Sequence, residues 1–347
     1  MPLLNRSLKI IIALAILPAL TPIRAEEPLD SLLNPIYPEI QKWATVIRVN
    51  EPETAPVFTT THFADSKDSV AFWPASTIKL YTVIAVLEWM NANRLPEDTS
   101  FTYSRQTSDK EWITDCSRTF IEMMSEVFRR SSNEDYTLLL RTLGIDAINT
   151  TFLIPANGFP HSALMRDYVS YRPAVYENEE PQRIRAITPD GSIRYFEHRW
   201  SGTSYAAQRG ATALSSTTGN CTSTAELADC LRRLIFHDSI PATQRFAIST
   251  KQSRLICEGD PDRGVIGLEN RLAGAYGWQQ SGELVFPKAR FFHKAGLIST
   301  YALDVCYLTD PESDNHLILA LAAHSGEEQV IRDMARTIYQ AAKDGKL

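Results

Sequence analysis

The chain has 347 residues, of which 44% are hydrophobic and 22% are charged, so it has enough apolar material for one large domain or two interleaved lobes. Its formal net charge is −6. An acidic chain with no basic stripe gives no electrostatic reason to bind nucleic acid, and we expect no nucleic-acid partner.

Residues 1–25 have the pattern of an export signal. Two basic residues precede an apolar run over residues 10–20, and Ala25 closes the segment just before two glutamates. The run is too short to span a bilayer, so we expect a mature chain of residues 26–347 that is periplasmic or secreted and has no membrane contact beyond the export signal. Ile23 is unusual near a cleavage site, which leaves an uncleaved anchor open.

The cysteines and histidines show no metal-binding spacing. Five cysteines are scattered along the chain, and their odd number leaves at least one unpaired, while the connectivity stays open. Cys230 is predicted on the apolar side of a helix and Cys306 within a strand, so we expect both to be buried as small hydrophobic side chains. The seven histidines include no His-Glu-x-x-His pattern. We expect no metal and no cofactor.

The first regular elements are a hairpin and a buried helix. Residues 43–49 and 57–63 are rich in β-branched and aromatic side chains and are separated by turn-forming residues, which predicts two antiparallel strands. A helix is predicted from about residue 75 to residue 92, since Pro74 is well tolerated at a helix N-terminus. Apolar side chains surround most of this helix, which indicates that it is buried on nearly all sides.

Two more helices are predicted around a polar triplet. Thr119 and Glu122 form a capping box at the start of a helix that reaches Arg130, and the next helix is stopped by Gly144. The triplet Ser-Ser-Asn at residues 131–133 lies between the two helices. Such a triplet is well placed to direct polar side chains into a cleft.

Residues 150–220 are the least regular part of the chain. A turn at residues 188–192 between two short apolar stretches predicts a small hairpin, which is flanked by long loops. Ser223 and Glu226 then form a second capping box ahead of an amphipathic helix.

The last part of the chain predicts strands followed by a helix. Residues 289–300, 301–308 and 317–323 are expected to form three strands. Ser325 and Glu328 are expected to cap the final helix.

The order of these elements predicts an α/β (α+β) fold. Strands at both ends of the chain would form one antiparallel sheet flanked by helices, with a helical lobe inserted in the middle. The α/β lobe would comprise about residues 35–75 and 240–347, and the helical lobe about residues 76–239.

Ser76 and Lys79 are the first candidates for chemistry. They stand three residues apart at the start of the buried helix, so their side chains project from the same face. A serine hydroxyl needs a base, and a lysine can be that base when burial lowers its pKa. A Ser-x-x-Lys spacing occurs by chance about once in a chain of this length. The alternative, a helix cap with a surface lysine, fits poorly because Lys79 lies within an apolar run.

Three ordered motifs resemble a known family. Ser76-x-x-Lys79 opens the buried helix, Ser131-x-Asn133 lies between helices, and Lys294-Ala295-Gly296 lies on a late strand. The chain therefore resembles the penicillin-recognising serine enzymes, above all the class A β-lactamases. The resemblance covers nearly all of the mature chain and implies the β-lactamase/transpeptidase-like fold.

The resemblance implies a role for each motif residue. Ser76 would attack a carbonyl to form an acyl-enzyme, with Lys79 as its base or as part of its proton relay, and Ser131 would pass a proton to the leaving nitrogen. Asn133 would bind the substrate's amide side chain, and Lys294 would bind a substrate carboxylate. The backbone N–H groups of Ser76 and Leu297 would form an oxyanion hole.

The chain also departs from the family pattern. Ala295 stands where the family has Thr or Ser, and Ser132 stands where it has Asp and is expected to give structural support. The family's deacylating Glu-x-x-Leu-Asn is missing. The carboxylates in roughly that region are Asp167, Glu177, Glu179 and Glu180. None can be assigned as a base, and we expect each to be a solvated surface group.

These features give three functional hypotheses. The first is an exported serine hydrolase that opens a β-lactam or a similar cyclic amide through an acyl-enzyme on Ser76. The alternative is a D-Ala-D-Ala peptidase-like enzyme that acts on peptidoglycan stems and lacks an efficient deacylating base. A third possibility is a catalytically idle binding protein on the same fold, which Ala295 motivates. The substrate of the first two is a small molecule, and we expect a monomer.

Overall fold

The computed structural model describes residues 29–169, 181–211, 213, 219–269, 289–310 and 315–347. The export signal predicted at residues 1–25 lies outside these ranges. Within them, no helix is both long enough and apolar enough to cross a membrane.

The main sheet is built from both ends of the chain, as predicted. It has five strands in the order β2-β1-β11-β10-β9, and every neighbouring pair is antiparallel. The strands are β1 (Lys42–Asn50), β2 (Val57–Phe63), β9 (Arg290–Ile298), β10 (Tyr301–Asp310) and β11 (Asn315–Ala323). The predicted first hairpin is β1 and β2. Because β9 is an edge strand among the described residues, one side of its backbone faces away from β10 and can line a site.

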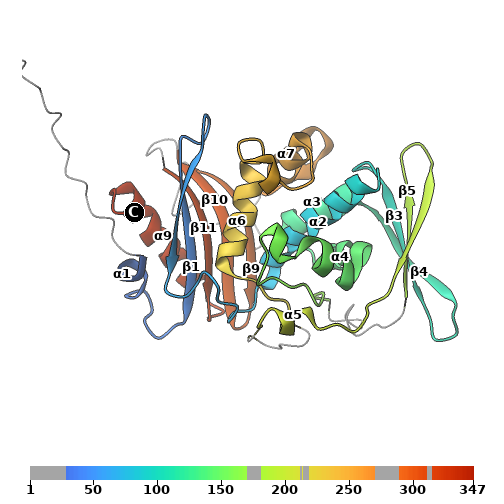
Figure 1. Cartoon of the computed structure of the whole chain (residues 1–347), viewed down its shortest axis with the longest axis horizontal. Helices are drawn as coiled ribbons and strands as arrows, with labels where there is room; N and C mark the ends of the chain where they lie inside the picture. The colour runs from blue at the N-terminus through green and yellow to red at the C-terminus, as the bar shows by residue number, and fades with distance from the viewer. Residues whose placement is uncertain (1–28, 170–180, 212, 214–218, 270–288, 311–314) are drawn as a thin grey trace, which may run out of the picture.

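Helices cover both faces of this sheet (Figure 1). On one face lie α1 (Leu29–Leu33) and α9 (Glu328–Lys343), whose apolar side chains form a core with the strands. On the other face α6 (Thr224–Ile235) packs against β1, β10 and β11. This double cover explains why nearly all of β10 and β11 is buried. Cys306 on β10 and Cys230 on α6 are buried thiols, as expected.

Two of the predicted helix caps differ in detail from the caps that the structure shows. The N-cap of α9 is Glu327, and Ser325 accepts a hydrogen bond from the Glu327 N–H instead of capping the helix, so that prediction is wrong. At α6 the Ser223 side chain accepts from the Glu226 N–H as expected. The Glu226 carboxylate, however, accepts from the His161 N–H, because a long loop packs against the helix at this point.

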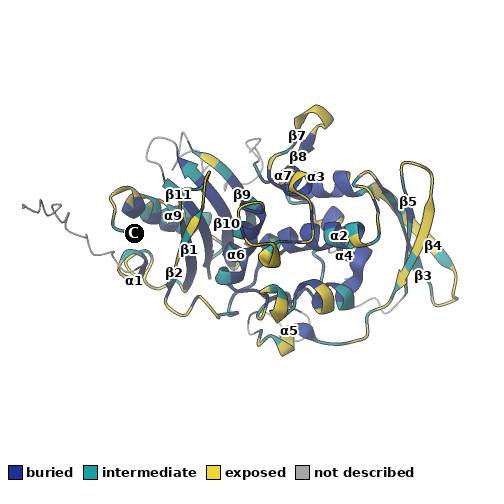
Figure 2. Ribbon diagram, turned by 45° about the horizontal axis from the view of Figure 1, so that its top comes forward, coloured by how far each residue is buried: buried dark blue, intermediate teal, exposed yellow. Residues whose placement is uncertain are grey.

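The middle of the chain forms the helical lobe. The predicted first helix consists of a 3-10 turn, η1 (Ala75–Ile78), and α2 (Lys79–Ala92), which is buried along most of its length (Figure 2). The next helices are α3 (Phe120–Arg130), with the predicted capping box, and α4 (Asn133–Ala147), which is broken at Gly144 where φ is +78°. The shorter elements are η2 (Ile148–Phe152), η3 (Pro155–Asn157), α5 (Tyr205–Gln208), η5 (Ala242–Gln244), α7 (Thr250–Glu258), β7 (Gly259–Asp260), η6 (Pro261–Arg263) and β8 (Val265–Ile266).

A second sheet closes the far side of this lobe and was not predicted as a whole. Its strands are β3 (Ser100–Gln106), β4 (Trp112–Thr119), β5 (Gln182–Ile187) and β6 (Ile193–His198), in the order β4-β3-β5-β6. The expected hairpin around residues 188–192 is β5 and β6. Phe101 and Tyr103 of β3 face the helices, while β4 is largely exposed and therefore carries a weak sequence signal.

Candidate active site

Ser76 lies where the chain turns sharply into η1. The preceding residue, Ala75, has φ +43°, a conformation that costs energy for a residue with a side chain. Thr77 donates both its N–H and its hydroxyl to the carbonyl of Pro74, which holds the turn. Ser76 is half-buried and lines two pockets, so its hydroxyl is accessible to a small molecule.

The Lys79 side chain is completely buried and is directed at the triplet between α3 and α4. Its Nζ donates to the Ser131 carbonyl at 2.5 Å, to Ser131 Oγ at 3.3 Å and to Asn133 Oδ1 at 2.6 Å. The structure therefore brings three of the predicted site residues together. Burial lowers the pKa of Lys79 well below its usual value, and the nearby Lys294 ammonium lowers it further. A lysine with a lowered pKa can accept a proton at neutral pH.

Two tyrosine rings enclose the Lys79 ammonium, and the sequence pattern did not indicate them. The Nζ atom lies 5.6 Å from the ring centroid of Tyr136 and 5.7 Å from that of Tyr168. Tyr168 donates its hydroxyl to the Ala75 carbonyl at 2.9 Å and accepts from Asn220 Nδ2 at 2.9 Å, so its ring is held in place. The aromatic faces stabilise a cation without supplying a base.

Ser131 stands between the two lysines. Its backbone is left-handed, with φ +56° and ψ +39°, and closes α3. Its Oγ accepts from Lys294 Nζ at 2.8 Å as well as from Lys79. A hydroxyl between two amines is well placed to relay a proton. Ser132 caps α4 by accepting from the Asp135 N–H at 3.1 Å, which confirms its expected structural role.

Lys294 projects from β9 toward the helical lobe, and burial lowers its pKa to about 7. The carboxylate of Asp304 on β10 acts in the opposite direction and raises it. His293 lies 3.2 Å from Asp304, measured between Nδ1 and Oδ2, and both side chains are buried. Alternation along a strand puts His293 on the other face of the sheet from Lys294, as predicted.

Gly296 allows β9 to pack directly on η1. A Cβ atom on Gly296 would lie 2.9 Å from the Ser76 nitrogen and 3.0 Å from the Pro74 carbonyl oxygen. The next residue, Leu297, pairs with Ala302 on β10 and belongs to the edge strand. The two backbones that carry the expected oxyanion-hole donors are thus in contact, while the direction of the donors stays a prediction.

Ser76 lies at the junction of two pockets. One pocket, of about 160 Å³, extends toward Arg130, Ser131 and Lys294. The other, of about 400 Å³, extends between Trp73 and Tyr168. Asn133 and Leu297 line both pockets, as Ser76 does. A substrate whose reacting carbonyl lies at Ser76 could therefore place its two ends in different surroundings, one lined by Arg130 and Lys294 and the other by aromatic rings together with Arg166.

Of the carboxylates considered from the sequence, Asp167 is the one that the described residues include, and it is not a surface group. Asp167 is only 1% exposed, so the expectation of a solvated carboxylate is wrong for this residue, because the loop that carries it folds into the lobe. Glu177, Glu179 and Glu180 lie outside the described residues. Of the described residues that line the two pockets beside Ser76, none is an aspartate or a glutamate. Nor do the described residues contain a cluster of three side chains that could hold a metal ion.

A family model described as the beta-lactamase enzyme family matches residues 54–342. The chain belongs to this family. No curated protein sequence matches it significantly. The match spans β2 to the end of α9 and so includes every predicted site residue.

Solved structures with the same fold are distant in sequence. The beta-lactamase from Sphaerobacter thermophilus is 18% identical with a TM-score of 0.54, over 90% of this chain and 96% of that one. An acyl-enzyme complex of a PBP-A mutant with penicillin G is 14% identical with a TM-score of 0.54, over 92% and 99%. The TLA-3 extended-spectrum beta-lactamase is 14% identical with a TM-score of 0.57, over 91% and 99%. At this identity the comparison establishes the β-lactamase/transpeptidase-like fold alone.

Proposed function

We propose that the protein is an exported serine hydrolase that opens a β-lactam or a related amide through an acyl-enzyme on Ser76. The observation that carries the proposal is the accessible Ser76 at the junction of two pockets, together with a fully buried Lys79 bonded to Ser131 and Asn133. The export pattern of residues 1–25 supports a periplasmic or secreted location.

The reaction begins at Ser76 and Lys79. Burial lowers the pKa of Lys79 and so favours its neutral amine, which takes the proton of the Ser76 hydroxyl as Ser76 Oγ attacks the substrate carbonyl. The backbone N–H groups of Ser76 and Leu297 stabilise the negative charge that develops on the carbonyl oxygen. Ser131 then delivers a proton to the leaving nitrogen and is recharged through Lys79.

Substrate recognition uses the remaining predicted residues. Lys294, whose Nζ also bonds Ser131, attracts a substrate carboxylate, and the side-chain amide of Asn133 holds an amide group of the acyl part. A neighbour of the same fold is described as an acyl-enzyme with penicillin G, which supports this class of substrate.

A second candidate function is a D-Ala-D-Ala peptidase-like activity with a long-lived acyl-enzyme. The observation that favours it is the surroundings of Ser76, where the described lining residues include no carboxylate to activate water. Tyr168 does not replace such a base, because burial raises the pKa of its hydroxyl. The alternatives therefore differ in the fate of the acyl-enzyme rather than in its formation.

The proposal is tested by the intact mass of the mature protein, followed over time after penicillin G is added. We expect an adduct of the penicillin mass on the wild type and none on Ser76→Ala, while Ser192→Ala in the distant turn behaves as wild type. A transient adduct identifies a β-lactamase. A lasting adduct together with cleavage of a D-Ala-D-Ala peptide identifies the second candidate. Labelling that persists in Ser76→Ala, or no labelling of the folded wild type, refutes both.

The acylation rate should depend on pH through Lys294. Lys294 is protonated below its pKa of about 7 and neutral above it, so its attraction for a substrate carboxylate is present at low pH and lost as pH rises. The second-order rate of acylation reports the free enzyme. We expect this rate to fall above about pH 7 for penicillin G relative to an uncharged ester of penicillin. The difference should disappear in Lys294→Gln, and a parallel pH profile for the two substrates would contradict the role.

A further inference from the structure

A pocket of about 590 Å³ lies away from Ser76, where α6 meets two short turns. Its walls are η3, the second half of α6 and the loop at residues 243–247. Glu88 of α2, at the opposite end of the helix from Lys79, also reaches it. None of the residues named in the reaction lines this pocket.

Arg233 is the unusual side chain of the pocket. It is only 7% exposed, its Nε donates to the Gln244 carbonyl at 2.6 Å, and its Nη1 donates to the Asn157 carbonyl at 2.7 Å. Within the described part of the chain, Arg233 forms no ion pair, and its Nη2 makes no hydrogen bond. A largely buried guanidinium with no carboxylate within ion-pair distance is costly, so an anion at this place would be stabilised.

The other charged groups around the pocket do not supply that anion. Asp229 forms an ion pair with Arg232, which donates to Asp229 Oδ1 from Nε at 2.9 Å and from Nη2 at 2.7 Å. Glu88 accepts from the Ala247 N–H; burial raises its pKa, while this hydrogen bond and the charge of Arg233 act in the opposite direction. Arg245 adds a further positive charge. The pocket therefore has three guanidinium groups against two carboxyl groups, which favours one bound negative charge.

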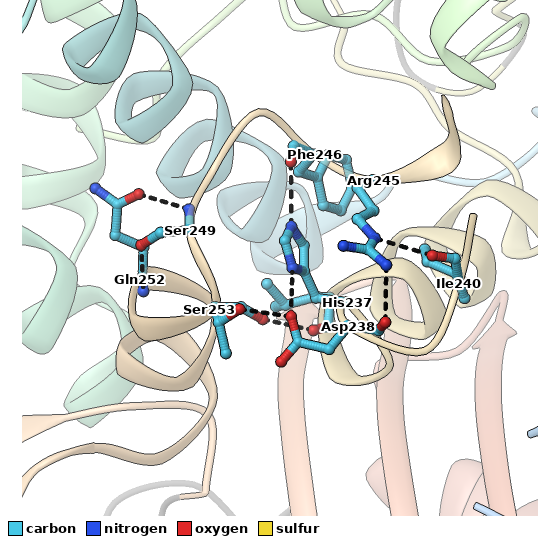
Figure 3. Close-up of polar contacts among 10 residues, drawn as sticks. His237, Asp238, Ile240, Arg245, Phe246, Ser249, Gln252 and Ser253 are labelled. Carbon is cyan, nitrogen blue, oxygen red and sulfur yellow. Dashed lines mark hydrogen bonds and ion pairs between the residues drawn. The ribbon is translucent and has the colours of Figure 1, made fainter. Parts of the chain in front are cut away.

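The wall opposite α6 is held in shape by its own hydrogen bonds (Figure 3). Arg245 donates to the Ile240 carbonyl at 2.9 Å and to the Asp238 carbonyl at 2.8 Å, and the ring of His237 lies 3.2 Å from the Phe246 carbonyl oxygen. These contacts tie both ends of the loop together. The pocket is thus preformed, and little conformational entropy is lost when a ligand binds.

Apolar and aromatic groups lie next to the charge. The ring of Phe246 stacks on that of Phe152 at 5.8 Å, and the Arg233 guanidinium lies 4.1 Å from the Phe246 ring centroid. Pro155 and Ala156 complete this side of the pocket. Phe152 and Phe246 are themselves buried under these contacts, whereas Pro155 and Ala156 are exposed, so a ligand that fits has one anionic group for Arg233 and an apolar part for Pro155 and Ala156.

We propose that this pocket binds a small aromatic or aliphatic monocarboxylate, with its carboxylate on Arg233 and its apolar part against Pro155 and Ala156. The site is separate from Ser76 and does not depend on the proposed hydrolase activity. Arginine binds a planar carboxylate through two parallel N–H groups, and the unused Nη2 is one such donor.

Benzoate tests the proposal, by ligand-observed NMR titration of the full mature chain. We expect benzoate to bind in the millimolar range and the neutral isostere benzamide to bind about tenfold more weakly, which is the loss of one charge-assisted contact. Inorganic phosphate should also bind more weakly, since it leaves the apolar wall uncovered. Equal binding of benzoate and benzamide, binding of phosphate as tight as that of benzoate, or no binding of benzoate overturns the proposal.

Two variants locate the binding. Arg233→Gln removes the charge and should weaken benzoate binding about tenfold. Because this change also breaks two loop contacts, Ala156→Trp provides a second variant, which fills the exposed rim of the pocket and removes no hydrogen bond. Arg336→Gln on the exposed side of α9 is the matched control and should bind as wild type. Unchanged benzoate binding in Ala156→Trp, or in a folded Arg233→Gln, places the ligand elsewhere and refutes the assignment.

Discussion

Replacing Lys79 by methionine is expected to slow the acylation of Ser76 by about 10²- to 10⁴-fold, the usual range for loss of a general base. Burial lowers the pKa of Lys79, which favours its role as a base, and its Nζ connects α2 to Ser131 and Asn133. Methionine keeps the length and apolar body of the side chain and removes only the amine. The measurement is the rate at which the penicillin adduct appears in the intact mass.

The melting temperature of Lys79→Met separates a loss of the base from misfolding. A buried ammonium carries a desolvation cost, so its removal offsets the lost hydrogen bonds, and we expect the melting temperature to change little. Lys251→Met, on the exposed first turn of α7, is the matched control and should keep full activity. Acylation of Lys79→Met within tenfold of wild type would mean that another group takes the serine proton.

Gly296→Ala is expected to slow acylation by about 10²-fold, comparable to the loss of one oxyanion-hole donor. The added Cβ would lie 2.9 Å from the Ser76 nitrogen and 3.1 Å from Ala75 Cβ, and these atoms belong to a backbone turn that cannot rotate away. The edge strand β9 must therefore move from η1, which separates the backbones of Ser76 and Leu297. Acylation rates of the variant and the wild type measure the effect.

The matching control, Gly267→Ala, carries an even tighter clash elsewhere. A Cβ on Gly267 would clash with the Gly259 nitrogen and lie 2.7 Å from the Cys257 carbonyl oxygen, outside both pockets of Ser76. Gly267→Ala and Gly296→Ala should both lower the melting temperature, as overpacking does. Only Gly296→Ala should lose acylation per folded molecule. Equal acylation losses in the two variants would show that strain in general, rather than the contact with Ser76, is responsible.

Much of the fold could be predicted because its signals are local. The hairpin β1–β2, the helix α2 and the capping box at Thr119 each depend on residues within a few positions of one another. The second sheet was missed because it joins β3 and β4 to a hairpin about 80 residues further along, and β4 is mostly exposed. Pairing over that distance leaves little trace in the local pattern.

The candidate site, like the fold, has a part that the local sequence predicts and a part that depends on residues far apart in the chain. The spacing of Ser76 and Lys79 on one helix is a local property, and it identified the nucleophile and its candidate base. Lys79 and Ser131 are 52 positions apart, and Lys294 and Ser131 are 163 positions apart. Their contacts were expected only through the family resemblance, because no periodicity links such distant residues.

The sequence by itself determined the buried helix with Ser76 and Lys79 at its start and the order of strands and helices that places both chain ends in one sheet. Only the tertiary structure decided that Tyr136 and Tyr168 enclose the Lys79 ammonium, that Asp167 is buried, and that Arg233 lacks an ion-pair partner in the described part of the chain. The physical reason is that burial and charge pairing depend on which elements pack together, whereas helix formation and capping depend on neighbours along the chain.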